Sequence, residues 1–415
     1  MIQADIAIIG AGPGGYVAAL RASQLGAKVV CIEKQHIGGV CLNWGCVPTK
    51  ALLHCAEVFA LAKEAANFGV VVDAPGYDWA KMQQHKAQVV QQLTGGVAML
   101  LDRAGVQVLM GEAAFVRQNT LQVTLNEGGT ESVVAENILI ATGSRPLQVP
   151  IPGLEGPNVL DSRGALALEA LPDSICIIGG GAIGLEFGSL FATLGVEVTL
   201  VEMLPRLAPL MDASIGEGLA WSLGNQGIAI KTNTRVTRIE HGESGCAVSM
   251  AGPDGEERIE VEKVLSAIGR APNVEGIGLE VLGIHPTRKG IQVDNRMRTA
   301  VPHVYAIGDV AVDGPMLAHV AFHQGVVAVE DALGHAAAMD YAAVPSCIFS
   351  RPEAASVGLT EEQAREQGYE VQVGIFGLAN NGKAIAMSET DGFVKVIAEA
   401  HHRAILGLHV VGPHA

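Results

Sequence analysis

Aromatic residues are scarce in this chain, and positive charges are outnumbered by negative ones. Phe, Trp and Tyr make up 4 % of the 415 residues, whereas hydrophobic residues make up 49 % and glycine contributes 51 residues. Apolar runs with glycine-filled turns are typical of buried parallel strands in α/β folds. The formal net charge of −16 argues against nucleic acid and anionic membrane as partners. A chain of this length can hold two or three domains, each with its own core.

Long apolar runs and a basic leader are also lacking. No apolar run reaches the roughly 18 residues that a membrane-spanning helix needs. The first residues, MIQADIAIIGAG, enter an apolar strand pattern at once, without a basic segment or a cleavage site. We therefore expect no secretion signal and a cytoplasmic protein.

Cysteine is sparse, and its number is odd. Seven cysteines in 415 residues argue against a disulfide scaffold. Cys31 and Cys176 lie in apolar strand patterns, which predicts inert core thiols. Only Cys41 and Cys46 form a close pair, in the stretch GGVCLNWGCVPTK (38–50).

Two segments of the chain repeat each other. They are DIAIIGAGPGGYVAALRASQLGAKVVCIEK (5–34) and SICIIGGGAIGLEFGSLFATLGVEVTLVEM (174–203). Each predicts a short strand, a glycine-rich turn, a helix and a second strand that ends in an acid, Glu33 or Glu202. The first glycine of the turn precedes that acid by 23 positions in both copies. This is the pattern of a βαβ dinucleotide-binding unit, present twice.

The glycines of each copy follow the G-x-G-x-x-G spacing. The first makes the turn, the second lets a pyrophosphate approach the backbone, and the third permits close packing of helix on strand. The helix N-terminus then faces the phosphates. Glu202 would repel a 2′-phosphate and the next Arg is Arg206, so NAD is favoured over NADP at the second copy. The glycines are Gly10, Gly12 and Gly15 in the first copy and Gly179, Gly181 and Gly184 in the second.

Further strand-ending turns suggest where domains meet. The stretches 138–145 and 264–273 each run from an apolar strand into a glycine turn, and 146–158 reads as a Pro-rich linker. In VYAIGDV (304–310), Asp309 is either a cofactor ligand or a turn residue. From about Tyr341 the pattern becomes β-rich, with a Thr-x-x-Gln capping box at 360–363.

The thiol pair follows the first βαβ unit and precedes a predicted helix. Cys46 and Lys50 are four residues apart and would share a face, where the helix N-terminus and the ammonium would stabilise a thiolate for disulfide exchange. Three other interpretations compete: a structural disulfide, half of a zinc site, and idle reduced thiols. We expect no metal.

These motifs make the chain similar to the flavin-dependent pyridine nucleotide-disulfide oxidoreductases. The resemblance covers essentially all 415 residues, and GGVCLNWGCVPTKALL is close to the redox-active segment of the family. Within the family, the stretches 316–325, 350–364 and 406–415 are similar to the enzymes that act on lipoamide. The resemblance implies an α/β fold with two Rossmann-like dinucleotide-binding domains, for FAD and NAD, and an incomplete α+β interface domain. The implied division is residues 1–147 and 271–340 for FAD, 148–270 for NAD and 341–415 for the interface.

The resemblance also implies which residues hold the cofactors. One FAD and one NAD would bind per chain, and Lys50 would lie near the flavin, paired with Glu186. The implied FAD residues are Gly10, Gly12, Gly15, Glu33, Lys50, Ala113, Thr142, Gly143, Ser144, Asp309, Met316, Leu317, Ala318 and His319. The implied NAD residues are Gly179, Gly181, Ala182, Ile183, Gly184, Glu202, Val236 and Gly269.

The implied reaction is a two-electron relay. A dihydrolipoyl thiolate attacks Cys41 of the oxidised pair, Cys46 leaves as a thiolate beside the flavin, and the electrons pass through FAD to NAD⁺. The implied partners are the lipoyl domain of an acyltransferase or of a glycine-cleavage carrier protein, and a second copy of the chain in a homodimer. Catalytic roles are expected for Cys41, Cys46, Lys50 and Glu186.

Family members carry a His-x-x-x-x-Glu segment near the C-terminus, whose His acts as the base across the dimer interface. This chain ends at Gly412-Pro413-His414-Ala415, so we expect a truncated interface domain, impaired lipoamide turnover and a weakened dimer. FAD and NADH should still bind. Two alternatives remain: a related disulfide or mercuric-type flavin reductase, and a nucleotide-binding flavoprotein without disulfide exchange.

Overall fold

A computed structural model of the chain describes residues 1–312 and 314–415. Its contacts define two compact units: unit 1 comprises residues 1–48, 87–145 and 270–341, and unit 2 comprises the segments 49–86, 146–269 and 342–415. The divisions after residues 145, 269 and 341 lie close to the expected domain boundaries, but residues 49–86 group with unit 2. The assignment of these stretches to FAD, NAD and interface domains stays a prediction.

A six-stranded sheet forms the core of unit 1. Parallel pairing joins β3, β2, β1, β5 and β16 in that order, and β4 pairs antiparallel with both β3 and β5. Ile9 lies opposite both Ile32 and Ile140, so three strands end at one edge, where such sheets bind ligands. The strands are β1 (Ile2–Ile9), β2 (Val29–Glu33), β3 (Gln107–Arg117), β4 (Thr120–Leu125), β5 (Thr130–Ile140) and β16 (Val304–Ala306).

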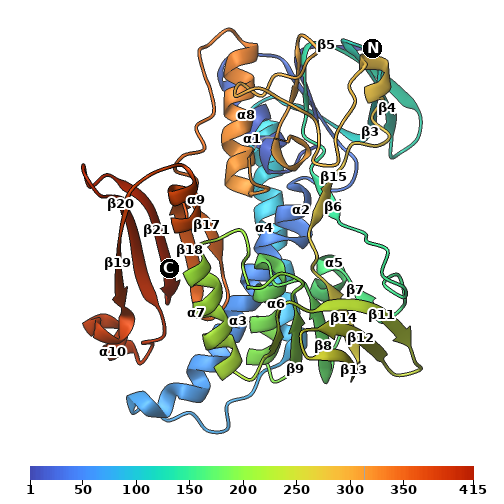
Figure 1. Cartoon of the computed structure of the whole chain (residues 1–415). Coiled ribbons are helices and arrows are strands. Elements are labelled where there is room, and N and C mark those ends of the chain that lie inside the picture. The colour runs from blue at the N-terminus through green and yellow to red at the C-terminus, as the bar shows by residue number, and fades with distance from the viewer. Residues whose placement is uncertain (313) are drawn as a thin grey trace. The chain divides into compact units, whose positions relative to one another are not determined.

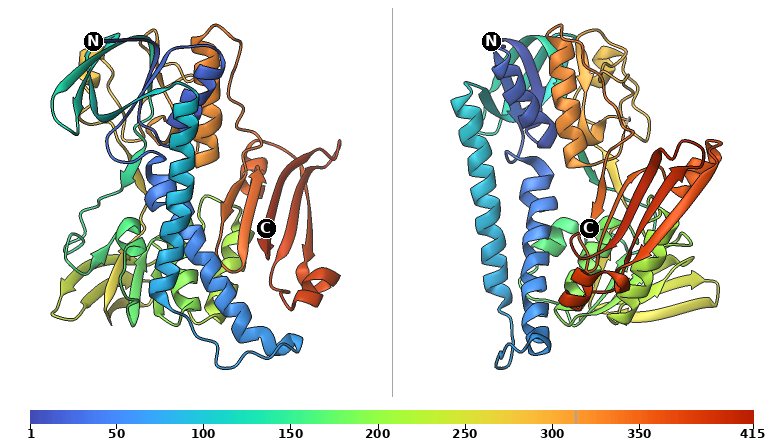
Figure 2. Two further views of the ribbon diagram at one scale, coloured as in Figure 1. Left: turned by 180° about the vertical axis from the view of Figure 1, so that it is seen from behind. Right: turned by 90° about the vertical axis from the view of Figure 1, so that its left-hand side faces the viewer.

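Small residues let two helices of unit 1 pack closely. Helices α1 (Pro13–Gln24) and α8 (Ala318–Ala332) lie side by side (Figures 1 and 2). A Cβ atom on Gly325 would lie 2.7 Å from the Gly14 carbonyl oxygen, so this approach requires glycine. The remaining elements of unit 1 are α2 (Gly39–Trp44), η2 (Leu279–Leu282), η3 (Gly308–Val310) and the pair β6 (Ser144–Pro146) and β15 (Arg270–Pro272). Helices α3 (Cys46–Glu64) and α4 (Trp79–Arg103) include residues assigned to both units, and η1 (Ala65–Phe68) belongs to unit 2.

Unit 2 contains the second repeat in a parallel sheet of order β10-β9-β8-β14-β7, and the antiparallel meander β11-β12-β13 is inserted in the chain between β10 and β14 (Figure 1). Ile178 lies opposite both Val201 and Ser266, which again brings three strands to one edge. The elements are β7 (Val159–Leu160), α5 (Ser162–Leu166), β8 (Ser174–Ile178), α6 (Ala182–Thr193), β9 (Glu197–Val201), α7 (Ala213–Asn225), β10 (Ala229–Lys231), β11 (Arg235–His241), β12 (Cys246–Gly252), β13 (Gly255–Val261) and β14 (Lys263–Ser266).

The C-terminal part of unit 2 is an antiparallel sheet of order β17-β18-β21-β20-β19. The capping box is confirmed, because the Thr360 side chain accepts from the Gln363 backbone and the Gln363 side chain from that of Thr360. The two parallel sheets with their βαβ turns confirm the predicted α/β fold. The elements are β17 (Ser346–Ile348), β18 (Glu353–Gly358), α9 (Glu361–Glu366), β19 (Val371–Gly377), η4 (Leu378–Asn380), α10 (Gly382–Met387), β20 (Phe393–Glu399) and β21 (Ile405–Gly412).

Candidate active site

The first glycine-rich turn connects β1 to α1 under tight steric limits. Gly10 has φ +107°, and a Cβ atom there would lie 2.3 Å from the Ala141 carbonyl oxygen. A Cβ atom on Gly15 would lie 1.8 Å from the Gly10 oxygen, so helix and strand could not pack as they do. Among the described atoms within 4 Å, a Cβ atom on Gly12 would meet only the Gly39 Cα, at 3.9 Å. The turn thus leaves space over Gly12, at the start of α1.

Glu33 is the last residue of β2, and its side chain forms a hydrogen bond with the backbone of this turn. Its carboxylate is 7 % exposed and accepts hydrogen bonds from the backbone N–H groups of Ala11 (2.8 Å), Gln35 (2.7 Å) and His36 (3.2 Å). The oxygen that bonds Ala11 accepts only this one bond from the described residues and has a second lone pair. It can therefore accept a ribose hydroxyl, which is the role expected for Glu33.

The thiol segment is built directly onto the first turn. The Gly38 N–H donates to the Ala11 oxygen (2.8 Å). A Cβ atom on Gly39 would lie 2.7 Å from the Gly12 Cα, so α2 begins against the space over the turn. Cys41 lies in α2 and is half-buried, whereas Cys46 is exposed at the first residue of α3. The chain therefore positions both thiols beside the first nucleotide turn.

Tyr16 is a neighbour of the thiol pair that the sequence analysis missed. Burial, together with the negative charges of Cys41 and Cys46, raises the pKa of its hydroxyl to about 12. Its ring packs against Phe322 of α8, with the centroids 5.8 Å apart. The only signal in the sequence is its position directly after the last glycine of the first fingerprint.

The turn after β5 and the turn after β16 come together. Ser144 donates to Asp309 (2.5 Å) and accepts from the Arg270 guanidinium (2.7 Å). Thr142 donates to the Asn273 oxygen (2.7 Å), and the Asn273 N–H donates to the oxygen of Gly143 (2.9 Å). The four residues implied as FAD ligands here, Thr142, Gly143, Ser144 and Asp309, are thus held by two neighbouring sets of hydrogen bonds. Arg270 and Asn273 belong to these sets and were not predicted, although both lie in the strand-ending turn 264–273.

The start of α8 lies near the turn that contains Asp309. Leu317 is the N-cap of this helix, and the Gly308 N–H donates to the buried Gln324 side chain (2.7 Å). This agrees with the expected helix start at residues 316–319. Ala113 is buried in the core on β3, so only its backbone could reach a ligand.

The second turn has the same steric limits as the first at its first and third glycines. Gly179 has φ +111°, and a Cβ atom there would lie 2.4 Å from the Ala267 oxygen. A Cβ atom on Gly184 would lie 1.9 Å from the Gly179 oxygen, whereas one on Gly181 would meet none of the described atoms within 4 Å. Glu202 is 7 % exposed and accepts from the N–H groups of Gly180 (2.6 Å) and Leu204 (2.7 Å).

The other implied NAD residues lie on three segments of unit 2. Ala182 and Ile183 begin α6, and Gly269 follows β14 with φ +125°. Val236 is 3 % exposed in the core of the unit, so only its backbone could contact a nucleotide.

Lys50 of α3 and Glu186 of α6 form the ion pair that the resemblance implies. The Lys50 ammonium lies 2.6 Å and 2.7 Å from the two carboxylate oxygens, and Glu186 is 5 % exposed. Phe349 was not predicted: its N–H donates to Glu186 (3.1 Å), and its ring lies 4.6 Å from the ammonium. Lys50 and Phe349 line a hollow of about 830 Å³ in unit 2. The roles of this pair remain predictions.

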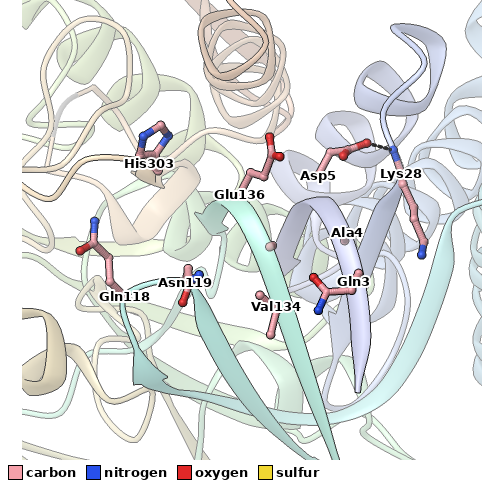
Figure 3. A pocket seen from close by; sticks show the side chains of 10 residues that line it. Gln3, Ala4, Asp5, Lys28, Gln118, Asn119, Val134, Glu136 and His303 are labelled. Carbon is pink, nitrogen blue, oxygen red and sulfur yellow. Dashed lines mark hydrogen bonds between the residues drawn. The ribbon is translucent and has the colours of Figure 1, made fainter.

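A second hollow of about 740 Å³ lies at the opposite edge of the unit 1 sheet (Figure 3). Its lining includes Asp5 and Glu136 as well as Lys28 and His303, and Asp5 already accepts from the Lys28 N–H (2.6 Å). It lies at the amino ends of the parallel strands, away from the nucleotide turns. The described residues contain no cluster of three or more potential metal ligands. Within the same residues, no helix is long and apolar enough to cross a membrane.

Two family models match this chain. Residues 4–325 match the pyridine nucleotide-disulphide oxidoreductase model, and residues 344–415 match the dimerisation domain of the same family. The C-terminal sheet is therefore the dimerisation domain, which supports a homodimer.

Relatives align along the whole chain. A dihydrolipoyl dehydrogenase of Geobacillus stearothermophilus is 41 % identical over 100 % of this chain and 88 % of its own length. One of Halobacterium salinarum is 43 % identical over 99 % of this chain and 87 % of its own length.

Solved structures of similar fold cover the chain completely. LpdA from Mycobacterium tuberculosis has a TM-score of 0.91 at 28 % identity, with 100 % of this chain and 90 % of that chain covered. The HOCl-induced flavoprotein disulfide reductase RclA from Escherichia coli, as a Cu(II) complex, has a TM-score of 0.88 at 32 % identity and the same coverage.

These matches do not support the expected truncation, because they extend to the last residues of the chain. The expected loss of turnover rested on that truncation and has no other support. The two glycine-rich turns, the adjacent thiol pair and both family models all indicate the same family. The chain belongs to the pyridine nucleotide-disulphide oxidoreductase family.

Proposed function

We propose that this chain acts as a dihydrolipoyl dehydrogenase, which oxidises protein-bound dihydrolipoamide and reduces NAD⁺. The observation that carries the proposal is the attachment of the thiol segment to the first nucleotide turn, through Gly38 and Gly39. Relatives about 41 % identical over the whole chain are dihydrolipoyl dehydrogenases, which favours lipoamide over other disulfide substrates.

The residues around both turns fit the two cofactors that this family uses. The first turn and the network of Ser144, Asp309 and Arg270 would hold FAD, together with Glu33 and the start of α8. The second turn would hold NAD through Gly181 and Glu202. In keeping with this, we assign residues 1–147 and 271–340 to FAD binding and residues 148–270 to NAD binding. When bound, FAD would supply the two-electron redox chemistry that connects the thiol pair with NAD⁺.

The thiol pair performs the disulfide exchange. One dihydrolipoyl thiolate attacks Cys41 Sγ, the Cys41–Cys46 bond breaks, and Cys46 leaves as a thiolate. The second dihydrolipoyl thiolate then attacks the mixed disulfide and releases Cys41, so the substrate becomes a cyclic disulfide and the pair becomes a dithiol. Placement of Cys46 at the start of α3 favours its thiolate, because a helix N-terminus stabilises negative charge.

Lys50 and Glu186 are proposed to set the charge beside the flavin. Glu186 is buried and bonds both the ammonium and the Phe349 N–H, so it fixes the position of Lys50. A fixed ammonium costs little reorganisation when negative charge develops next to it. The physiological partners would be the lipoyl domain of an acyltransferase or of a glycine-cleavage carrier, in the cytoplasm.

A substrate comparison tests this proposal. The FAD-loaded protein is supplied with dihydrolipoamide and NAD⁺, and NADH formation is followed by absorbance. Parallel reactions with NADH supply lipoamide, glutathione disulfide or Hg(II) as the acceptor. We expect turnover with both lipoamide forms and at least about tenfold less with the other acceptors. Preference for glutathione disulfide or Hg(II) would favour a related reductase instead.

Cys46→Ser is the matched variant for the thiol pair. It should abolish oxidation of dihydrolipoamide while NADH still reduces the flavin, because only the thiol half of the relay is removed. Turnover of dihydrolipoamide by Cys46→Ser at the wild-type rate would contradict the assignment of the pair.

A further inference from the structure

The loop after Glu202 packs against the second nucleotide turn and carries Arg206. Ala208 donates its N–H to the Gly180 oxygen (2.8 Å), and the Leu207 side chain packs against Gly180, where a Cβ atom would come within 2.7 Å of it. Arg206 precedes these two contacts directly. Residue 206 is therefore held on the loop that follows the acid of the second βαβ unit, and in such units an Arg near this acid accepts the 2′-phosphate of NADP.

Arg206 is engaged by a carboxylate of α9. Its two terminal nitrogens lie 2.6 Å from the two oxygens of Glu362, one bond to each. This two-pronged geometry uses the fork of donors that a phosphate would otherwise occupy. The Arg206 side chain is 30 % exposed, so a ligand that displaced Glu362 could reach its guanidinium from solvent.

The backbone of the turn that carries Glu362 is held by contacts of its neighbours, whereas the Glu362 side chain itself is 52 % exposed. The capping box at Thr360 orders the first turn of α9. The N–H of Glu361 donates to Asp212 (3.0 Å), and the Glu361 carboxylate bonds Lys395 (2.8 Å). Asp212 is 1 % exposed and caps α7, so the start of α9 is tied to the nucleotide-binding part of unit 2. The capping box and the contacts of Glu361 thus both hold the turn from which Glu362 reaches Arg206.

A second cation near Glu202 is also paired. The Glu202 N–H donates to the Lys231 oxygen (2.8 Å), and the Lys231 ammonium lies 2.6 Å from the Glu257 carboxylate. Arg206 and Lys231 are thus each paired with a carboxylate of another element. A 2′-phosphate would have to displace one of these carboxylates before it gained a cationic partner.

We infer that Glu362 is a specificity-determining residue for the second nucleotide. By holding Arg206 it withholds the guanidinium from a 2′-phosphate, and it adds to the direct repulsion by Glu202. This inference rests on the proposed function, which assigns the second turn to NAD. It extends nucleotide selection to a residue of the dimerisation domain, 160 positions after Glu202 in the sequence.

The test uses Glu362→Gln in the FAD-loaded protein. Dissociation constants for NADH and NADPH are taken from the concentration dependence of flavin reduction under anaerobic conditions. Release of Arg206 should tighten NADPH binding about tenfold, because a charge-assisted pair becomes available, and should leave NADH within about twofold. The gain should shrink at high salt, because the pair is partly exposed. Glu366→Gln, on the same helix with the same charge change, should not alter the ratio of the two constants.

Two further variants make the outcome decisive. Arg206→Ala combined with Glu362→Gln should return the ratio to the wild-type value, and Glu362→Asp, which keeps the charge, should stay near it. An unchanged ratio in Glu362→Gln, or a gain that survives the loss of Arg206, would overturn the inference while NADH still reduces the flavin. If neither nucleotide reduced the flavin of the wild-type protein, the proposed function itself would fail.

Discussion

Gly181→Ala should weaken nucleotide binding but leave the free energy of unfolding almost unchanged, and the structure indicates the size of both effects. Gly181 is the N-cap of α6, with φ −80° and ψ −176°, a conformation that alanine adopts without strain. Alanine stabilises a chain by about 0.4–1 kcal/mol through the unfolded state. It is a poorer N-cap than glycine by a similar amount. The two effects offset, so we expect the free energy of unfolding to change by less than about 0.5 kcal/mol and Tm by less than about 2 °C.

The affinity for NADH should fall sharply in the same variant. The added methyl group would occupy the space that Gly181 leaves for the pyrophosphate, since it meets none of the described atoms within 4 Å. Loss of one hydrogen bond between a backbone N–H and a phosphate is worth about 1.5–3 kcal/mol. The Kd for NADH should therefore rise about 10- to 100-fold.

Gly184→Ala is the matched control, one turn further along α6. Its Cβ atom would lie 1.9 Å from the Gly179 oxygen, so the helix must move away from the strand, at a cost of about 1–3 kcal/mol or more. Thermal unfolding and calorimetric titration with NADH measure both effects. If Gly181→Ala bound NADH as tightly as the wild type, the second turn would not be the nucleotide site.

Three further perturbations test other parts of the molecule. Glu186→Gln removes the anchor of Lys50 and should slow flavin reduction by NADH at least about tenfold, which stopped-flow absorbance would show; an unchanged rate would deny the pair a role. Asp212→Asn should lower the free energy of unfolding by about 3 kcal/mol at pH 7, because it breaks the buried bond to Lys395 (2.8 Å). Burial opposes the charge of Asp212, but hydrogen bonds from Glu361, Lys395 and Ser214 outweigh it and hold the pKa well below its usual value. The Asp212 carboxylate thus stabilises the fold at pH values above its unfolded pKa of 3.8. The difference in the free energy of unfolding between wild type and Asp212→Asn, measured by urea titration, should therefore shrink as the pH falls below about 4. A difference that grew in acid would contradict this sign. Burial lowers the pKa of His409 below its usual 6.5, so the wild type should lose stability relative to His409→Gln as the pH falls through 6.5; a gain in stability there would refute this.

Local patterns predicted the scaffold of the site because each depends on residues close together in the sequence. Gly10, Gly15 and Glu33 lie within one βαβ unit, and apolar strands with glycine turns define such units without tertiary information. The capping box at Thr360 was found for the same reason. The helix that begins at Cys46 was predicted from the stretch that follows it.

The missed residues come from distant segments that only the fold brings together. Arg270 meets Ser144 across 126 positions, and Phe349 meets Glu186 across 163. No fixed separation in the sequence predicts either contact, because each depends on how distant segments are arranged in the fold. Arg206 was noticed as the next basic residue after Glu202, but its partner Glu362 could not be identified from the sequence.

The central claim is that the thiol pair passes electrons from dihydrolipoamide to a flavin and then to NAD⁺. The most direct test is an anaerobic mixture of the FAD-loaded protein with dihydrolipoamide, followed by NAD⁺, with the absorbance spectrum recorded after each addition. The account predicts a long-wavelength band between thiolate and flavin after the first addition, which fades as NADH appears after the second. A flavin spectrum that dihydrolipoamide leaves unchanged, in protein whose flavin NADH does reduce, would contradict it.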